Sequence, residues 1–69
     1  MHMVTKKVEV EEIDHLATGQ NFRIFRMARG VSIRKLADKA GLTASYISDL
    51  ERGHRAWSQK LLDRLLEAL

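Results

Sequence analysis

The stretch from Ser32 to Gly53 constrains the fold of this chain more than any other part of its sequence. Ser32 can accept a hydrogen bond from the free amides of a first helix, and Thr43 can do the same for a second. Gly41 stands between them, where the first helix must stop, because glycine enters the left-handed conformation at little cost. The stretch therefore predicts two short helices joined by a tight turn, each of which needs the other for stability.

Apolar residues recur at helical spacing on both sides of this turn. The first helix carries an apolar stripe, and the second turns two large residues inward: Ile33, Leu36, Ala37 and Ala40, then Ile47 and Leu50. The opposite face of the second helix is then left to small and polar residues: Ala44, Ser45, Ser48, Asp49 and Arg52.

A further helical pattern precedes this unit. Phe22 and Phe25 supply its apolar face, and we expect both to join the core. The helix should begin between Leu16 and Thr18, with Asp14 or Thr18 as its cap.

Another helical pattern follows the unit. Ser58 is its predicted cap, and its wide apolar stripe contains five leucines: Leu61, Leu62, Leu65, Leu66 and Leu69. One buried face does not need all five, so we expect Leu66 to stay outside the core and to be available for a dimer contact. Trp57 has two interpretations, as a core residue or as an exposed anchor for a partner.

The 69 residues are enough for one small domain, and no proline interrupts the helical patterns. We expect an all-α fold of four to five helices in residues 16–69, preceded by an N-terminal arm in residues 1–15. Val8 to Glu11 alternate like an edge strand, which would have to pair with a second copy of the protein. The alternative is a frayed polar arm.

The spacing of Ala37, Gly41, Ile47 and Leu50 resembles the helix-turn-helix of the phage repressor and Cro family. The segment from Tyr46 to Gly53, YISDLERG, is similar to the usual end of that family's recognition helix. The resemblance covers about residues 19–69. It implies a compact lambda-repressor-like domain that binds DNA.

The resemblance also implies an ion pair between the first helix and the end of the recognition helix. Arg26 stands where family members often place an arginine, and Glu51 where they place its glutamate partner. The alternative for Arg26 is an ordinary surface arginine. If the pair is partly buried, the loss of one partner should cost a few kcal/mol of stability.

The family's base-reading positions fall here on Ala44, Ser45, Ser48 and Asp49. The two serines can bond to many groups, and Ala44 can touch a thymine methyl. Asp49 can accept a hydrogen bond from cytosine N4, but its charge also repels phosphates. A contact with the arm or with a partner is therefore the alternative for Asp49.

Contacts to the DNA phosphates are expected from the start of both helices and from the loop after Gly53. Ile33 occupies the position of the family's phosphate-binding glutamine and cannot make that contact, so Arg34 or the helix N-terminus would supply it. Tyr46 either bonds a phosphate or packs beside the preceding helix. The expected phosphate contacts are Arg34, Thr43, Tyr46, Arg52, His54 and Arg55, with Arg55 the strongest.

The charge distribution favours a nucleic-acid partner. The formal net charge is only +3, but residues 20–60 contain nine Lys or Arg against three acidic residues, a net charge of +6. Such a footprint suits phosphate contacts, although a solvated helical surface is the alternative. The sequence lacks cysteine, clustered histidines, a carboxylate pair and a glycine-rich phosphate loop, which argues against catalysis.

These observations predict a sequence-specific regulator of transcription that binds a double-stranded DNA operator, as a homodimer on an inverted repeat. It would act by steric occupation of the operator, as a repressor. The alternative is a helix-turn-helix scaffold for protein interactions, such as an antitoxin or adaptor. We expect no cofactor, metal, membrane or small-molecule substrate. A cytoplasmic location follows from the lack of cysteines and of an apolar leader.

Overall fold

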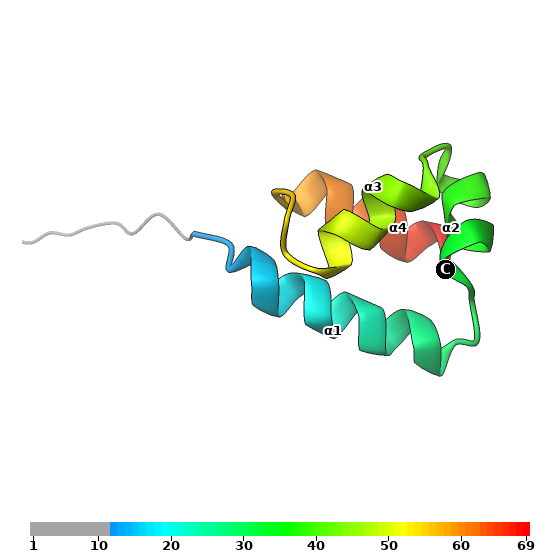
Figure 1. Cartoon of the computed structure of the whole chain (residues 1–69), viewed down its shortest axis with the longest axis horizontal. Coiled ribbons are helices and arrows are strands. Elements are labelled where there is room, and N and C mark those ends of the chain that lie inside the picture. The colour runs from blue at the N-terminus through cyan, green and yellow to red at the C-terminus, as the bar shows by residue number, and fades with distance from the viewer. Residues whose placement is uncertain (1–11) are drawn as a thin grey trace, which may run out of the picture.

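The computed structural model describes residues 12–69, which form four helices and no strand. The helices are α1 (His15–Ala28), α2 (Ile33–Ala40), α3 (Ala44–Glu51) and α4 (Gln59–Ala68), shown in chain order from blue to red in Figure 1. The all-α prediction is confirmed, with the smaller of the expected helix numbers in the described part. The alternating strand expected in the N-terminal arm falls on residues 1–11, which lie outside the described residues.

The predicted caps of α2, α3 and α4 are confirmed. The side-chain oxygens of Ser32, Thr43 and Ser58 each accept the backbone N–H three residues further on, at 3.0–3.1 Å. Gly41 ends α2 in the left-handed conformation, with φ 70°, which a residue with a side chain rarely adopts. The limits of the helix-turn-helix unit are therefore set by interactions between residues close in sequence.

α1 begins earlier than expected. Asp14 is its cap, because Asp14 Oδ1 accepts the N–H of Ala17 at 3.0 Å, and the helix therefore starts at His15. Thr18, the other expected cap, lies inside the helix.

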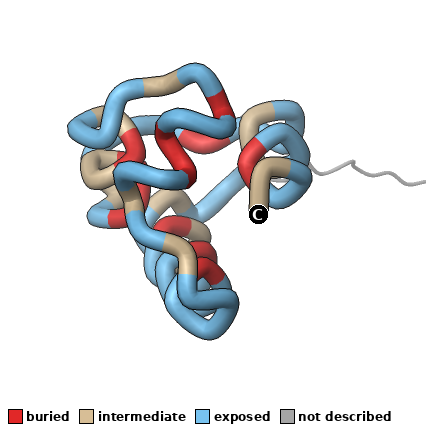
Figure 2. The backbone as a smooth tube through the Cα atoms, turned by 90° about the vertical axis from the view of Figure 1, so that its right-hand side faces the viewer, coloured by how far each residue is buried: buried red, intermediate tan, exposed pale blue. Residues whose placement is uncertain are grey.

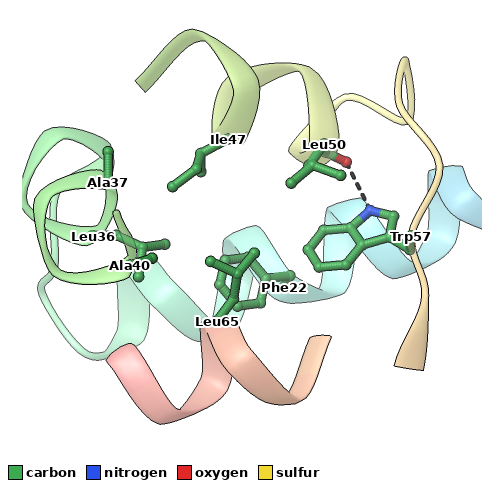
Figure 3. Close-up of a cluster of buried hydrophobic side chains, with 8 residues drawn as sticks. All are labelled: Phe22, Leu36, Ala37, Ala40, Ile47, Leu50, Trp57 and Leu65. Atoms are coloured by element: carbon green, nitrogen blue, oxygen red, sulfur yellow. Dashed lines mark hydrogen bonds between the residues drawn. The ribbon is translucent and has the colours of Figure 1, made fainter. Parts of the chain in front are cut away.

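Eight buried side chains form the core, and they come from all four helices and from the loop before α4: Phe22, Leu36, Ala37, Ala40, Ile47, Leu50, Trp57 and Leu65 (Figure 3). The tube in Figure 2 likewise shows buried segments in each helix. The predicted inward residues of α2 and α3 are confirmed. Leu65 is buried as expected, and Leu61, Leu62 and Leu69 are partly buried against the core.

Gly19 permits the close packing of α1 on α3. A Cβ atom at this position would lie 2.3 Å from the backbone oxygen of Leu50 and 2.7 Å from that of Glu51. Both neighbours are backbone atoms at the end of α3, so neither can rotate away. The absence of a side chain at Gly19 therefore sets the distance between the two helices.

Phe25 departs from the predicted core, since 41% of its surface is exposed. The reason is the arrangement of the helices: the backbone of α1 approaches α3, that of α3 approaches α2, and that of α2 approaches α4, whereas the backbones of α1 and α4 lie further apart. Their side chains instead leave an open groove of about 430 Å³, lined by Thr18, Asn21, Phe22, Phe25, Leu62 and Leu66.

Candidate nucleic-acid interface

The helix-turn-helix unit holds α3 by one face and leaves the other accessible. Ile47 and Leu50 are fully buried and fix α3 against the core. The four predicted base-contacting residues fall on the opposite face by helical spacing. Ala44 and Ser45 are exposed, whereas Ser48 and Asp49 are partly buried. Of these four residues, the exposed ones therefore lie in the N-terminal turn of α3, the part of a recognition helix that enters the major groove.

A buried ion pair fixes the other end of α3. Arg26 Nε donates to Glu51 Oε2 at 2.6 Å, and Arg26 Nη2 donates to Glu51 Oε1 at 3.0 Å. Arg26 Nη1 also donates to the carbonyl oxygen of Val31 at 2.6 Å. The two side chains are 8% and 3% exposed, so the charges satisfy each other away from water. The structure thus confirms the pairing of Arg26 with Glu51 that the resemblance implied. The alternative, that Arg26 is an ordinary surface arginine, is wrong.

Arg55 lies in the loop after α3 and contacts two residues of that helix. Its Nε atom is 3.9 Å from Asp49 Oδ2, and its Cζ atom is 5.4 Å from the centre of the Tyr46 ring. The Arg55 side chain remains 59% exposed. Sequence reasoning did not anticipate this contact of Asp49, which had been assigned to a base, the arm or a partner.

Trp57 anchors the same loop to the core. Only 3% of its surface is exposed, and its indole Nε1–H donates to the carbonyl oxygen of Leu50 at 2.9 Å (Figure 3). The centre of its ring lies 5.3 Å from the centre of the Phe22 ring. The core interpretation of Trp57 is therefore confirmed, and the exposed-anchor interpretation is wrong. Its backbone N–H donates to His15 Nδ1 at 3.0 Å, a contact between residues far apart in sequence that no local pattern indicates.

The remaining predicted phosphate contacts are accessible to solvent. Arg34, Arg52 and His54 are exposed. The Thr43 hydroxyl accepts the N–H of Tyr46 at 3.1 Å, which leaves its own proton free to donate. Tyr46 is partly buried against the core, as its packing interpretation predicts. Whether these groups bind phosphates stays a prediction.

The positive charge predicted for residues 20–60 lies on the surface. The only buried charged residues among those the structure describes are Arg26 and Glu51, which cancel each other. The other eight Lys and Arg of this segment are all exposed, against Asp38 and Asp49. A net charge of +6 therefore remains available to attract a polyanion.

The described part of the chain shows neither a metal site nor a membrane-spanning helix. Residues 12–69 contain no group of three or more His, Asp or Glu side chains placed to hold a metal ion. None of the four helices has both the length and the apolar character needed to cross a membrane.

Comparison with known proteins gives the family. A family model described as helix-turn-helix matches residues 22–69. The chain belongs to this helix-turn-helix family. The match contains α2, the turn, α3 and α4, and the resemblance to phage repressors and Cro is thereby confirmed.

Regulators of transcription are among the similar proteins. The transcriptional regulator ClgR of Mycobacterium tuberculosis is 35% identical over 51 residues, which are 74% of this chain and 46% of that protein. The chain thus spans under half the length of this relative. The crystal structure of the clp gene regulator ClgR from C. glutamicum superimposes with a TM-score of 0.78 at 36% identity, covering 84% of this chain and 75% of that one.

The restriction-modification controller protein C.AhdI from Aeromonas hydrophila is also similar. Its crystal structure gives a TM-score of 0.74 at 38% identity and covers 80% of both chains. The structures of ClgR and C.AhdI are therefore both similar in fold to this helix-turn-helix protein.

Proposed function

We propose that this helix-turn-helix protein is a sequence-specific DNA-binding regulator of transcription. The observation that carries the proposal is the accessible N-terminal turn of α3, held by a buried inner face within a segment, residues 20–60, that carries a net surface charge of +6. The similar proteins named as regulators, ClgR and C.AhdI, support it.

In the proposed complex the first turn of α3 lies in the major groove of the operator. Ala44, Ser45 and Ser48 contact the base edges there. The groups at the ends of the helices and in the following loop bind phosphates: Arg34, Thr43, Arg52, His54 and Arg55. Phosphate contacts fix the register of the protein on the duplex, and base contacts select the sequence.

We further propose that the protein binds as a homodimer and represses by occupying an inverted repeat in the cytoplasm. The apolar groove between α1 and α4 supports a contact between two copies, because Phe25 and Leu66 beside it are 41% and 40% exposed. Sedimentation of the wild type should show a dimer that Leu66→Ala weakens. Met27→Ala is the matched control, since Met27 is an exposed apolar residue that does not line the groove.

The decisive experiment is selection of bound duplexes from a random DNA library. An enriched inverted repeat, with half-sites about one helical turn apart, is the expected result. Arg55→Ala should weaken binding. It should also reduce the slope of log Kd against log salt by about 1, the change expected for the loss of one phosphate contact. Arg29→Ala makes the same change of charge at the end of α1, outside the helix-turn-helix unit, and should have a smaller effect.

Two other outcomes would change the proposal. Enrichment of a single half-site would support DNA binding by a monomer and contradict the homodimer. If no sequence is enriched at moderate salt and Arg55→Ala changes nothing, a protein-interaction module such as an antitoxin or adaptor becomes the better description. No catalytic step is proposed for either function.

A further inference from the structure

The loop that carries Arg55 is fixed at both ends before any ligand binds. At its start, the N–H of His54 donates to the carbonyl oxygen of Asp49 at 2.9 Å. At its end, Trp57 is held by Leu50 and His15 through the two hydrogen bonds described above. The backbone on either side of Arg55 is thus anchored to α3 and α1, and the position of its Cα atom is set by the fold.

The Arg55 side chain is held in turn by two residues of α3 that lie three positions apart. The Tyr46 ring supports the guanidinium by a cation–π contact at 5.4 Å. The Oδ2 atom of Asp49 lies 3.9 Å from the Nε atom of Arg55. Tyr46 is itself packed against the core, so the support on this side has a fixed position.

The contact at Nε leaves the rest of the guanidinium free. Arginine has five N–H donors in a planar fork, and the two Nη groups provide four of them. No protein hydrogen bond to either Nη group of Arg55 is present in the described residues. With 59% of the side chain exposed, these groups can bind one phosphate with two parallel hydrogen bonds.

We propose that Tyr46 and Asp49 are positioning residues that orient Arg55 toward a DNA phosphate. This inference rests on the proposed function and gives two of the predicted DNA-contacting residues a different role. Asp49 does not read a base, and Tyr46 acts through its ring rather than through its hydroxyl. The Arg55 side chain then loses less conformational freedom on binding, because these two contacts already favour its bound orientation in the free protein.

The sign of one substitution separates this role from plain electrostatics. Asp49→Asn removes a negative charge close to the DNA, which by charge alone should strengthen binding. Loss of the positioning contact should instead weaken it about two- to fivefold, the range for an exposed ion pair. Asp38→Asn removes an exposed negative charge of α2 that has no contact with Arg55, and it should not weaken binding.

The experiment measures Kd by fluorescence anisotropy for the selected duplex and for duplexes with single base-pair changes. In the proposal, Asp49→Asn weakens binding to all of them evenly, and it no longer weakens binding in an Arg55→Ala background, where only the favourable loss of charge remains. Tyr46→Phe, which keeps the ring, retains more affinity than Tyr46→Leu. A parallel NMR measurement on the free protein should show faster exchange of the Arg55 Nε–H in Asp49→Asn and Tyr46→Leu.

Each contrary result has a distinct meaning. Stronger binding by Asp49→Asn, or an effect confined to one base pair that persists without Arg55, overturns the positioning role while DNA binding stands. A greater loss in Tyr46→Phe than in Asp49→Asn assigns the Tyr46 hydroxyl to a phosphate and overturns the role of its ring. Failure of the wild type to bind any duplex overturns the proposed function and the positioning role together.

Discussion

Two of the arginine–carboxylate contacts that join α3 to other parts of the described molecule differ in almost every physical property. Glu51, the last residue of α3, pairs with Arg26 of α1 through two hydrogen bonds, at 2.6 and 3.0 Å, between side chains that are at most 8% exposed. Asp49, two residues earlier, lies 3.9 Å from Arg55, whose side chain is 59% exposed.

Burial explains why these two arginine–carboxylate pairs have different roles. Removing one partner of a buried pair leaves an uncompensated charge, which makes the pair important for stability. An exposed pair exchanges its partner for water at little cost, so it contributes little to stability and remains able to bind a ligand. We therefore assign the Arg26–Glu51 pair to the fold and the Asp49–Arg55 contact to the proposed interface.

The largest expected effect comes from breaking the buried pair. Glu51→Ala should lower the free energy of unfolding by about 3–5 kcal/mol, because Arg26 is left buried without its carboxylate. Urea denaturation followed by circular dichroism measures the loss. Asp49→Ala is the matched control and should cost less than about 1 kcal/mol. Equal losses in the two variants would contradict the comparison.

A second buried link at the end of α3 should have a smaller effect. Trp57→Phe keeps an aromatic ring in the core but removes the donor to the Leu50 carbonyl oxygen. The Leu50 carbonyl oxygen still accepts the N–H of Gly53 at 3.1 Å, so losing the bond from Trp57 should cost about 0.5–1.5 kcal/mol, and loss of part of the ring adds to this. Thermal unfolding would measure the change, and a variant as stable as the wild type would show that the hydrogen bond contributes nothing.

The exposed beginning of α3 should be less sensitive than its buried end. Thr43→Ala removes the cap that accepts the Tyr46 N–H and should cost about 1 kcal/mol. Thr43→Ser keeps the hydroxyl and should restore most of the stability. If serine and alanine variants are equally unstable in urea, the cap is not the source of the effect.

The smallest effect is expected for a second arginine beside the same carboxylate, because this arginine is exposed and lies further from Glu51. Arg23 Nε lies 4.0 Å from Glu51 Oε1, but the Arg23 side chain is 60% exposed. Arg23→Ala should change the free energy of unfolding by about 0.5 kcal/mol or less. Urea denaturation would test this; a loss approaching that of Glu51→Ala would show that burial of the arginine does not decide the strength of these contacts.

Much of the candidate site could be located from the sequence, because the features that mark it are local. Ser32, Gly41 and Thr43 delimit α2 and α3 through interactions within a few residues, and helical spacing alone separates the buried Ile47 from the exposed Ser45. The resemblance to phage repressors and Cro added the pairing of Arg26 with Glu51, which spans 25 positions and has no local signal.

Other features depended on how the helices cross. Phe25 has the spacing of a core residue, yet 41% of its surface is exposed because the backbone of α1 lies close to α3 and further from α4. Gly19 carried a weak signal, since a glycine inside a helix is costly and indicates close packing, but its neighbours at the end of α3 could not be named. The partner of His15 could not be named from the sequence either, because His15 accepts the N–H of Trp57, which lies 42 positions away.

The sequence by itself thus determined an all-α fold, the caps of α2, α3 and α4, a helix-turn-helix unit and the surplus of positive charge around it. These follow from hydrogen bonds and periodicities that act over one or two helical turns. Only the tertiary structure decided that Trp57 is buried, that an apolar groove stays open between α1 and α4, and that Asp49 lies against Arg55. Such contacts depend on the angles and distances between helices, which are fixed by the packing of the whole core and not by any one segment.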